Sequence, residues 1–219
     1  MKQSGDVDGL RNALDHQGAA EGDGTAWSLS PAARAEAAAA LATFDGALVE
    51  DGLALALTDP DPRVRGTALD RISQRTKPVA VDALLDGVVK WPYPEGYDAL
   101  ETTVATLVGW APPGIAEAYV RKLLEPDSPE LDERHQDTLG ALTAADPAGE
   151  TAETQLADYL VVQLDEPGGA ARVARIQQLL TWLGPAAVDS VVRKIDSGAG
   201  SAPVILTAGA LRDARAVEP

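Results

Sequence analysis

The 219-residue sequence contains no cysteine, which excludes a disulfide framework and any metal site built on thiolates. It has only two histidines, His16 and His135, and they lack the close spacing of a helical zinc motif. We interpret the charged run at 132–137, DERHQD, as a solvated helix face. A metal site built from Asp132, His135 and a distant carboxylate is the alternative interpretation. The sequence therefore predicts no cofactor and no metal.

Aromatic residues are also scarce, at 4% with a single Phe, although 45% of the residues are hydrophobic. A core of this composition must be built from Ala, Leu and Val, which suits closely packed helices better than a β-sandwich. The sequence also lacks a Gly-rich phosphate loop and a Gly-x-Ser-x-Gly elbow. We therefore expect an all-α protein that is not an enzyme and has no catalytic residues.

Basic residues are few, because 18 Lys and Arg face 34 Asp and Glu and leave a net charge of −16. This balance argues against nucleic acids and anionic membranes as partners, since both are bound through clustered Lys and Arg. The sequence shows no signal segment and no apolar run long enough to cross a bilayer. We expect a soluble, cytoplasmic protein. Its acidic surface serves solubility in the simpler interpretation, and binds a basic partner in the alternative.

The most informative stretch is residues 53–72, LALALTDPDPRVRGTALDRI, which reads as two short helices joined by an Asp-Pro-Asp-Pro turn. Asp59 precedes a proline and so ends the first helix, whereas Asp61 and Pro62 supply an N-cap and a first helical residue. The apolar residues of the second helix, at 64, 68, 69 and 72, share one face. Such a helix pair cannot bury its apolar faces alone, so we expect copies stacked beside it.

The pattern of Asp59-Pro60-Asp61-Pro62 followed by Val64, Arg65, Ala68 and Leu69 resembles a HEAT repeat, particularly the phycobiliprotein-lyase-like type. Residues 183–188, LGPAAV, resemble the junction that opens HEAT helices. The resemblance implies an α-solenoid of about six helix pairs wound as a right-handed superhelix. It also implies that a turn aspartate and an arginine form a ladder between neighbouring repeats, a structural role that falls on Asp59 and Arg65.

Breaks at Pro and Gly divide the rest of the chain into helices of similar length. The first helices of successive pairs are predicted to start near 46, 78, 113, 149 and 185, a repeat typical of solenoids. We assign 1–29 to a first helix and a Gly-rich connector, and 30–219 to one continuous solenoid domain. Residues 215–219 resemble the beginning of another helix, so two alternatives stay open: a stub that covers the last repeat, or part of a longer array.

One interhelix loop holds an unusual share of the aromatic residues, in the segment WPYPEGY at 91–97, and Trp110 ends the helix that follows. Two prolines stiffen this loop, which favours recognition at low entropic cost. The candidate binding residues are therefore Trp91, Tyr93, Tyr97 and Trp110. The alternative interpretation is a loop that folds back and covers the core.

We predict a non-enzymatic scaffold or adaptor that binds a partner protein or peptide on the concave surface of the solenoid or at the aromatic loop. The resemblance also implies two enzyme alternatives, a HEAT-like DNA glycosylase and a bilin-lyase-like enzyme. The charge of −16 opposes the first, and the chain has no cysteine to hold a chromophore for the second. The sequence sets neither the partner nor the oligomeric state.

Overall fold

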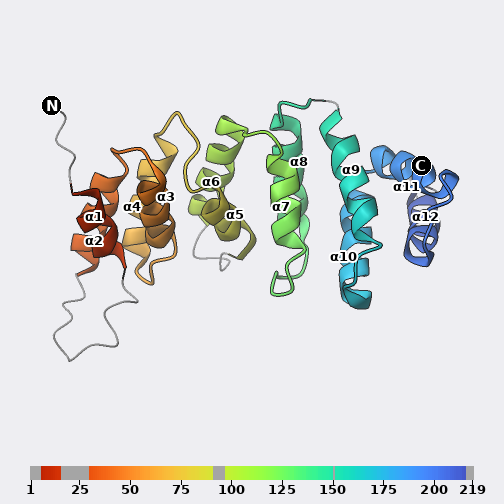
Figure 1. Ribbon diagram of the computed structural model, residues 1–219, viewed down its shortest axis with the longest axis horizontal. Coiled ribbons are helices and arrows are strands. Elements are labelled where there is room, and N and C mark those ends of the chain that lie inside the picture. The colour runs from red at the N-terminus through yellow and green to blue at the C-terminus, as the bar shows by residue number, and fades with distance from the viewer. Residues whose placement is uncertain (1–5, 16–29, 91–96, 150, 216–219) are drawn as a thin grey trace. The chain divides into compact units, whose positions relative to one another are not determined.

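A computed structural model describes residues 6–15, 30–90, 97–149 and 151–215, with the side chains at 97 and 212–215 outside the description (Figure 1). Over these residues it shows twelve helices and no strand, which confirms the all-α class. The helices are α1 (Val7–Leu14), α2 (Pro31–Leu41), α3 (Ala47–Leu57), α4 (Pro62–Ser73), α5 (Val81–Lys90), α6 (Tyr97–Trp110), α7 (Ile115–Leu123), α8 (Glu133–Ala145), α9 (Thr151–Gln163), α10 (Gly169–Trp182), α11 (Pro185–Asp196) and α12 (Ala202–Arg215).

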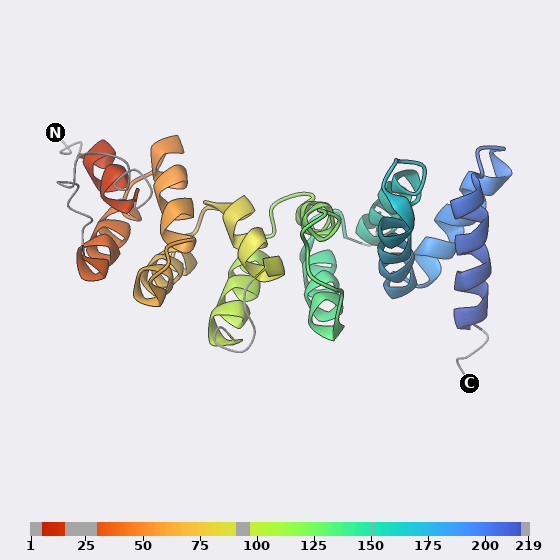
Figure 2. The same cartoon turned by 90° about the horizontal axis from the view of Figure 1, so that it is seen from below.

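The helices pack in six consecutive pairs, from α1 with α2 to α11 with α12 (Figures 1 and 2). Neighbouring pairs stack through like helices: α1 on α3 and α3 on α5 among the first helices, and α2 on α4 and α4 on α6 among the second. In the C-terminal half, α7 packs on α9, α9 on α11 and α10 on α12. This is the packing of an α-solenoid, and it follows the pairing that the sequence spacing predicted.

The chain divides into two compact units, Met1–Trp110 and Ala111–Pro219. The helix within residues 1–29, α1, packs against α2 and α3 and is thus part of the first unit. The assignment of residues 30–219 to one continuous domain stays a prediction. In both units the core is mainly aliphatic, with fully buried residues such as Leu53, Ile72 and Leu107 in the first and Leu139 and Leu179 in the second.

Local chemistry explains where the second helices begin. Ser30 caps α2 by accepting the N–H of Ala33 at 3.3 Å, and Asp61 caps α4 by accepting the N–H of Arg63 at 2.9 Å. A proline follows each cap at the first helical position, where its missing N–H costs nothing. Each cap stabilises its helix by about 1 kcal/mol, so the turn residues set where α2 and α4 begin.

Candidate binding groove

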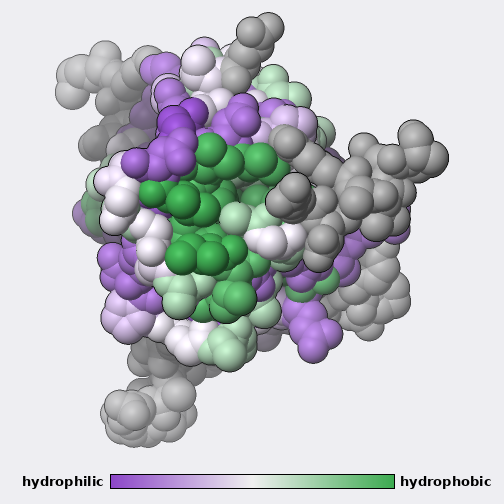
Figure 3. Space-filling view, turned by 90° about the vertical axis from the view of Figure 1, so that its right-hand side faces the viewer, coloured by the Kyte–Doolittle hydropathy of each residue, from purple (hydrophilic) through white to green (hydrophobic). Residues whose placement is uncertain are grey.

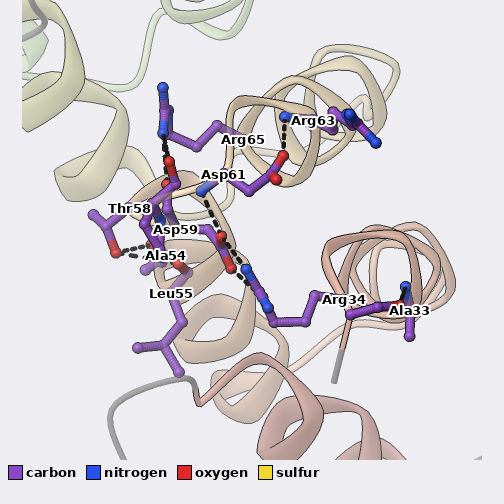
Figure 4. A network of polar contacts seen from close by, with 11 residues as sticks. Ala33, Arg34, Ala54, Leu55, Thr58, Asp59, Asp61, Arg63 and Arg65 are labelled. Atoms are coloured by element: carbon purple, nitrogen blue, oxygen red, sulfur yellow. Dashed lines mark hydrogen bonds and ion pairs between the residues drawn. The ribbon is translucent and has the colours of Figure 1, made fainter. Parts of the chain in front are cut away.

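A buried, bidentate ion pair of the first unit joins two neighbouring helix pairs. Arg34, on α2, donates from Nε to Oδ2 of Asp59 at 2.7 Å and from Nη2 to Oδ1 at 2.8 Å (Figure 4). Both residues are buried, with only 7% of Arg34 and 1% of Asp59 exposed. The hydrogen bond to Asp59 raises the pKa of Arg34, outweighing the opposite effect of burial. This bidentate pair is the rung that holds the first pair to the turn of the second.

The two residues predicted to form the ladder, Asp59 and Arg65, each find their partner elsewhere: Asp59 in the preceding helix pair and Arg65 within its own turn. The guanidinium of Arg65 donates to the backbone oxygens of Asp59, at 2.7 Å, and of Pro60, at 2.9 Å, within its own turn (Figure 4). The side-chain partner of Asp59 is Arg34, which occupies in α2 the position that Arg65 occupies in α4, four residues after the N-cap. The missed signal was this matched spacing, from Ser30 to Arg34 and from Asp61 to Arg65.

Arg34 and Asp59 hold the turn between α3 and α4, and α3 forms one side of a groove. Oδ1 of Asp59 also accepts the N–H of Asp61 at 2.9 Å, so the turn is bound on both sides. Thr58, the residue before it, hydrogen-bonds back to Ala54 and Leu55 of α3 at 3.2 and 3.1 Å (Figure 4). These three residues, Ala54, Leu55 and Thr58, line the groove. The ion pair of Arg34 and Asp59 thus supports the turn beside the groove but does not line the groove.

The groove has a volume of about 760 Å³ and lies along the first helices of three successive pairs. It is lined by Arg11 of α1, by the face of α3 between residues 50 and 58, and by residues 78–83 and 86 at the start of α5. A smaller hollow of about 350 Å³, reaching Arg65 and Lys90, shares Thr58, Ala83 and Asp86 with it. The two hollows therefore form one surface feature of the first unit.

Acidic side chains border an apolar floor in this groove. Glu50 and Asp51 come from α3, and Asp82 and Asp86 from α5. The floor is formed by aliphatic residues: Ala54, Leu55, Val79, Val81 and Ala83. Only one cation, Arg11, lines the larger hollow over the described residues, and it pairs with Asp15 at 3.6 Å. The arrangement suits an occupant that is cationic and has an apolar body.

A family model for HEAT repeats matches residues 26–96, the segment that holds α2 to α5. Residues 26–96 therefore carry HEAT repeats. The match covers the ladder and most of the groove, and it confirms the family inferred from the Asp-Pro turn. HEAT repeats are generally scaffolds for protein interactions and are typically not enzymes. No characterised protein and no solved structure matches the chain.

Of the four aromatic residues proposed as a binding patch, the structure describes the side chain of Trp110. Trp91 and Tyr93 lie outside the described residues, and Tyr97 is described only as the backbone start of α6. Trp110 is half-buried at the end of α6, and its indole N–H donates to the backbone oxygen of Arg75 at 2.8 Å. This bond ties the helix pair α5–α6 to the end of α4. A binding role for the four aromatic residues stays a prediction.

His135 does not lie on a solvated helix face, contrary to the sequence interpretation. It is fully buried at the third position of α8, where its backbone N–H donates to Oδ1 of Asp132 at 3.1 Å and its Nδ1 lies 3.2 Å from the backbone N of Asp132. The two residues form a capping box, which leads the imidazole inward. Burial acts to raise the pKa of Asp132, but the N–H of His135 and the charge of Arg134 hold that pKa below its usual value.

No group of three or more His, Asp or Glu residues suited to a metal ion occurs in the part of the chain that the structure describes. Over the same residues, no helix combines the length and the apolar character needed to cross a membrane. Three arginines that the sequence places near the C-terminal end bind within the second unit. Arg172 donates to the backbone and side chain of Gln163, Arg175 to the backbone oxygens of Leu123 and Ser128, and Arg193 to Asp158.

Proposed function

We propose that this HEAT-repeat chain is a non-enzymatic scaffold that holds a basic segment of a partner protein in the groove along α1, α3 and α5. The observation that carries the proposal is the pairing of an apolar floor with carboxylates on both α3 and α5. HEAT arrays present extended surfaces to partners, and the groove is about twice the volume of the hollow beside it.

The charge of the groove selects the chemistry of the partner. Lys and Arg side chains lay their aliphatic stems on apolar surface and keep their charged heads at its edge, which matches carboxylates around an aliphatic floor. Solvated charge pairs of this kind contribute about 0.2–1 kcal/mol each. Several of them, together with burial of the aliphatic stems, are consistent with micromolar binding that weakens with salt.

This location differs from the one inferred from the sequence. The concave surface of the second helices and the aromatic loop were the predicted binding surfaces, and both stay predictions. The groove instead lies on the first helices, whose side chains face it from α3 and α5. The acidic composition, for which solubility was the simpler interpretation, supplies the carboxylates of Glu50, Asp51 and Asp82 that a basic segment would contact. The fourth, Asp86, pairs with Lys90 at 3.7 Å.

The test uses a fluorescent peptide of about twelve residues in which lysine alternates with leucine or alanine, and a matched peptide with glutamate in place of lysine. Fluorescence anisotropy is measured with the wild-type chain and with the double variant Glu50→Gln, Asp82→Asn. We expect binding of the lysine peptide only, and an approximately tenfold weaker affinity in the variant, equal to about 1.4 kcal/mol.

The matched control is Glu166→Gln, Asp189→Asn, which removes the same two charges from exposed positions of the second unit. It is expected to bind the lysine peptide as the wild type does. Equal weakening by both double variants would mean that the overall charge of −16 attracts the peptide without a site, and would overturn the groove as the binding surface.

A further inference from the structure

Two arginines of the second unit bond to uncharged oxygens and to no carboxylate among the described residues. Arg172 donates from Nη1 and Nη2 to the backbone and side-chain oxygens of Gln163, and Arg175 from the same two atoms to the backbone oxygens of Leu123 and Ser128. The other lysines and arginines of this unit whose side chains the structure describes each form an ion pair with Asp or Glu. The charges of Arg172 and Arg175 are therefore held in place without being neutralised.

Both arginines line one hollow of about 430 Å³, formed by the turn after α7, the turn between α9 and α10, and the first turns of α10. A volume of this size is typical of sites for small ligands or for one side chain of a partner. Glu125 is the one carboxylate in the lining over the described residues, and it pairs with Lys122 at 3.7 Å. The other walls are mainly apolar and include Leu124, Pro126, Pro167 and Ala171.

The two guanidinium groups are positioned before any ligand binds. Arg172 and Arg175 are three residues apart on α10, so their side chains are neighbours on the helix surface. A Cβ added at Gly168 would meet the Cβ, Cγ and Cδ atoms of Arg172, so the glycine leaves the space through which this side chain runs. A guanidinium has five N–H donors, and the bonds to Gln163, Leu123 and Ser128 use two on each arginine. The other donors are available to an anion in the hollow.

The distribution of charge favours a ligand with one compact anionic group. A chain with a net charge of −16 repels an extended polyanion. The positive charge does not continue onto α12, because residues 198–211, GAGSAPVILTAGAL, hold no charged side chain, and hydrophobic residues gather in one patch on that side of the unit (Figure 3). A phosphate monoester concentrates about 1.5–2 negative charges on three acceptor oxygens, which matches two guanidinium groups and their paired donors.

We propose that this hollow binds a single phosphate group, with Arg172 and Arg175 donating to its oxygens. The phosphate is carried either on a serine or threonine of a partner segment, whose apolar neighbours contact the prolines of the hollow, or on a small molecule. The site does not depend on the proposed function of the groove, because it lies in the second unit and takes a ligand of the opposite charge. Binding weakens as salt is raised, since the contacts are between charged groups.

Fluorescence anisotropy of the full chain tests this proposal with a labelled peptide of about ten residues that carries one phosphoserine among alanine, leucine and proline. The matched peptide has an unmodified serine. We expect saturable binding of the phosphopeptide with a dissociation constant below about 1 mM, and none of the serine peptide over that range. Competition then separates the two sources of phosphate. Inorganic phosphate that displaces the peptide near the peptide's own dissociation constant identifies the phosphate alone as the ligand, and displacement only at roughly hundredfold higher concentration identifies the peptide segment.

Charge variants of α10 locate the site without removing the bonds of the arginines. Ala171→Glu places a carboxylate in the hollow and is expected to weaken phosphopeptide binding by about tenfold or more. The matched control is Ala170→Glu, which adds the same charge at the neighbouring exposed residue of the same helical turn, outside the lining of the hollow, and should bind within about threefold of the wild type.

The double variant Arg172→Gln, Arg175→Gln removes the proposed donors and is expected to abolish binding, whereas Arg193→Gln, at an arginine of the same unit that does not line the hollow, should leave it unchanged. Circular dichroism verifies that the helices are retained, and Ala171→Glu with its control decides the matter if the double variant does not fold. Equal binding of the serine peptide, no saturable binding of the phosphopeptide up to about 1 mM, or equal effects of Ala171→Glu and Ala170→Glu would each overturn the phosphate site.

Discussion

The ion pair between Arg34 and Asp59 permits a quantitative test of how HEAT pairs are held together. Arg34→Met removes the guanidinium and keeps an unbranched side chain of similar reach. It leaves the carboxylate of Asp59, which is 1% exposed, without the two bonds of 2.7 and 2.8 Å. Breaking a buried pair from one side costs about 3–5 kcal/mol, because the remaining charge must stay desolvated.

The double variant Arg34→Met, Asp59→Asn removes both charges. The amide oxygen of Asn at 59 retains the acceptor for the N–H of Asp61, which the carboxylate binds at 2.9 Å in the wild type. We therefore expect the double variant to lose clearly less stability than the two single variants added together. The coupling free energy should be at least about 2 kcal/mol, within the range for contacting charged residues.

The matched control is the exposed pair of Arg193 and Asp158, which also joins neighbouring helix pairs, at 2.6 Å, but leaves about half of each side chain, 54%, in solvent. Its cycle, with Arg193→Met and Asp158→Asn, should give a coupling below about 1 kcal/mol. The difference between the two cycles isolates the effect of burial from that of the chemical groups.

Urea unfolding followed by circular dichroism measures each variant, and amide hydrogen exchange of α2 and α4 assigns the loss to the first unit. The exchange measurement is needed because repeat arrays do not always unfold in a single step. A loss below about 1 kcal/mol for Arg34→Met, or equal coupling in the buried and exposed cycles, would refute the assignment of Arg34 and Asp59 as the rung between the first two pairs.

Three further predictions concern single residues. Ala80 has φ of 49°, in the left-handed region, so Ala80→Gly should raise the unfolding free energy by about 0.5–1 kcal/mol, whereas Ala83→Gly inside α5 should lower it, as measured in urea. Trp110→Phe removes the donor to the backbone oxygen of Arg75 and should cost about 1 kcal/mol or more, read from exchange at the end of α4; no change there would show that the bond does not tie the pairs. The pKa of Asp132 is lowered in the folded chain, so its charge stabilises the second unit above the unfolded-state pKa of about 3.9 and ceases to do so as pH falls through the folded value. Asp132→Asn keeps a capping acceptor, so the stability gap between the variant and the wild type should be full at pH 7 and should disappear once the pH lies below the folded-state pKa of Asp132; a gap independent of pH would show that the charge has no part in it.

The helix pairs were predictable from the sequence because their signals are local. An Asp-Pro or Ser-Pro start and a regular spacing fix where helices begin and which ones follow each other, and α2 and α4 begin as expected. The burial of His135 was missed because a charged run says nothing about which side of a helix packs. The three-residue spacing from Asp132 to His135 nevertheless carries the capping box that the structure shows.

The groove and the rung could not be predicted in the same way, because each depends on residues brought together by stacking. Arg34 and Asp59 are 25 positions apart, and Arg11 meets residues 78–86 only after α1, α3 and α5 have packed. The repeat nevertheless implies both features once one copy is understood. If the arginine four residues after a second-helix cap binds turn oxygens, then Arg172, which follows Gly168 at that distance, should bind a neighbouring turn.

Arg172 does so, at the end of α9, where it donates to the backbone and side-chain oxygens of Gln163 at 2.7 and 2.6 Å. The same position therefore has one physical task, the satisfaction of oxygens at the turn between two helices, and only its partner changes. Arg34 reaches the carboxylate of Asp59 in the next pair, whereas Arg65 and Arg172 bind oxygens at the turn of their own pair.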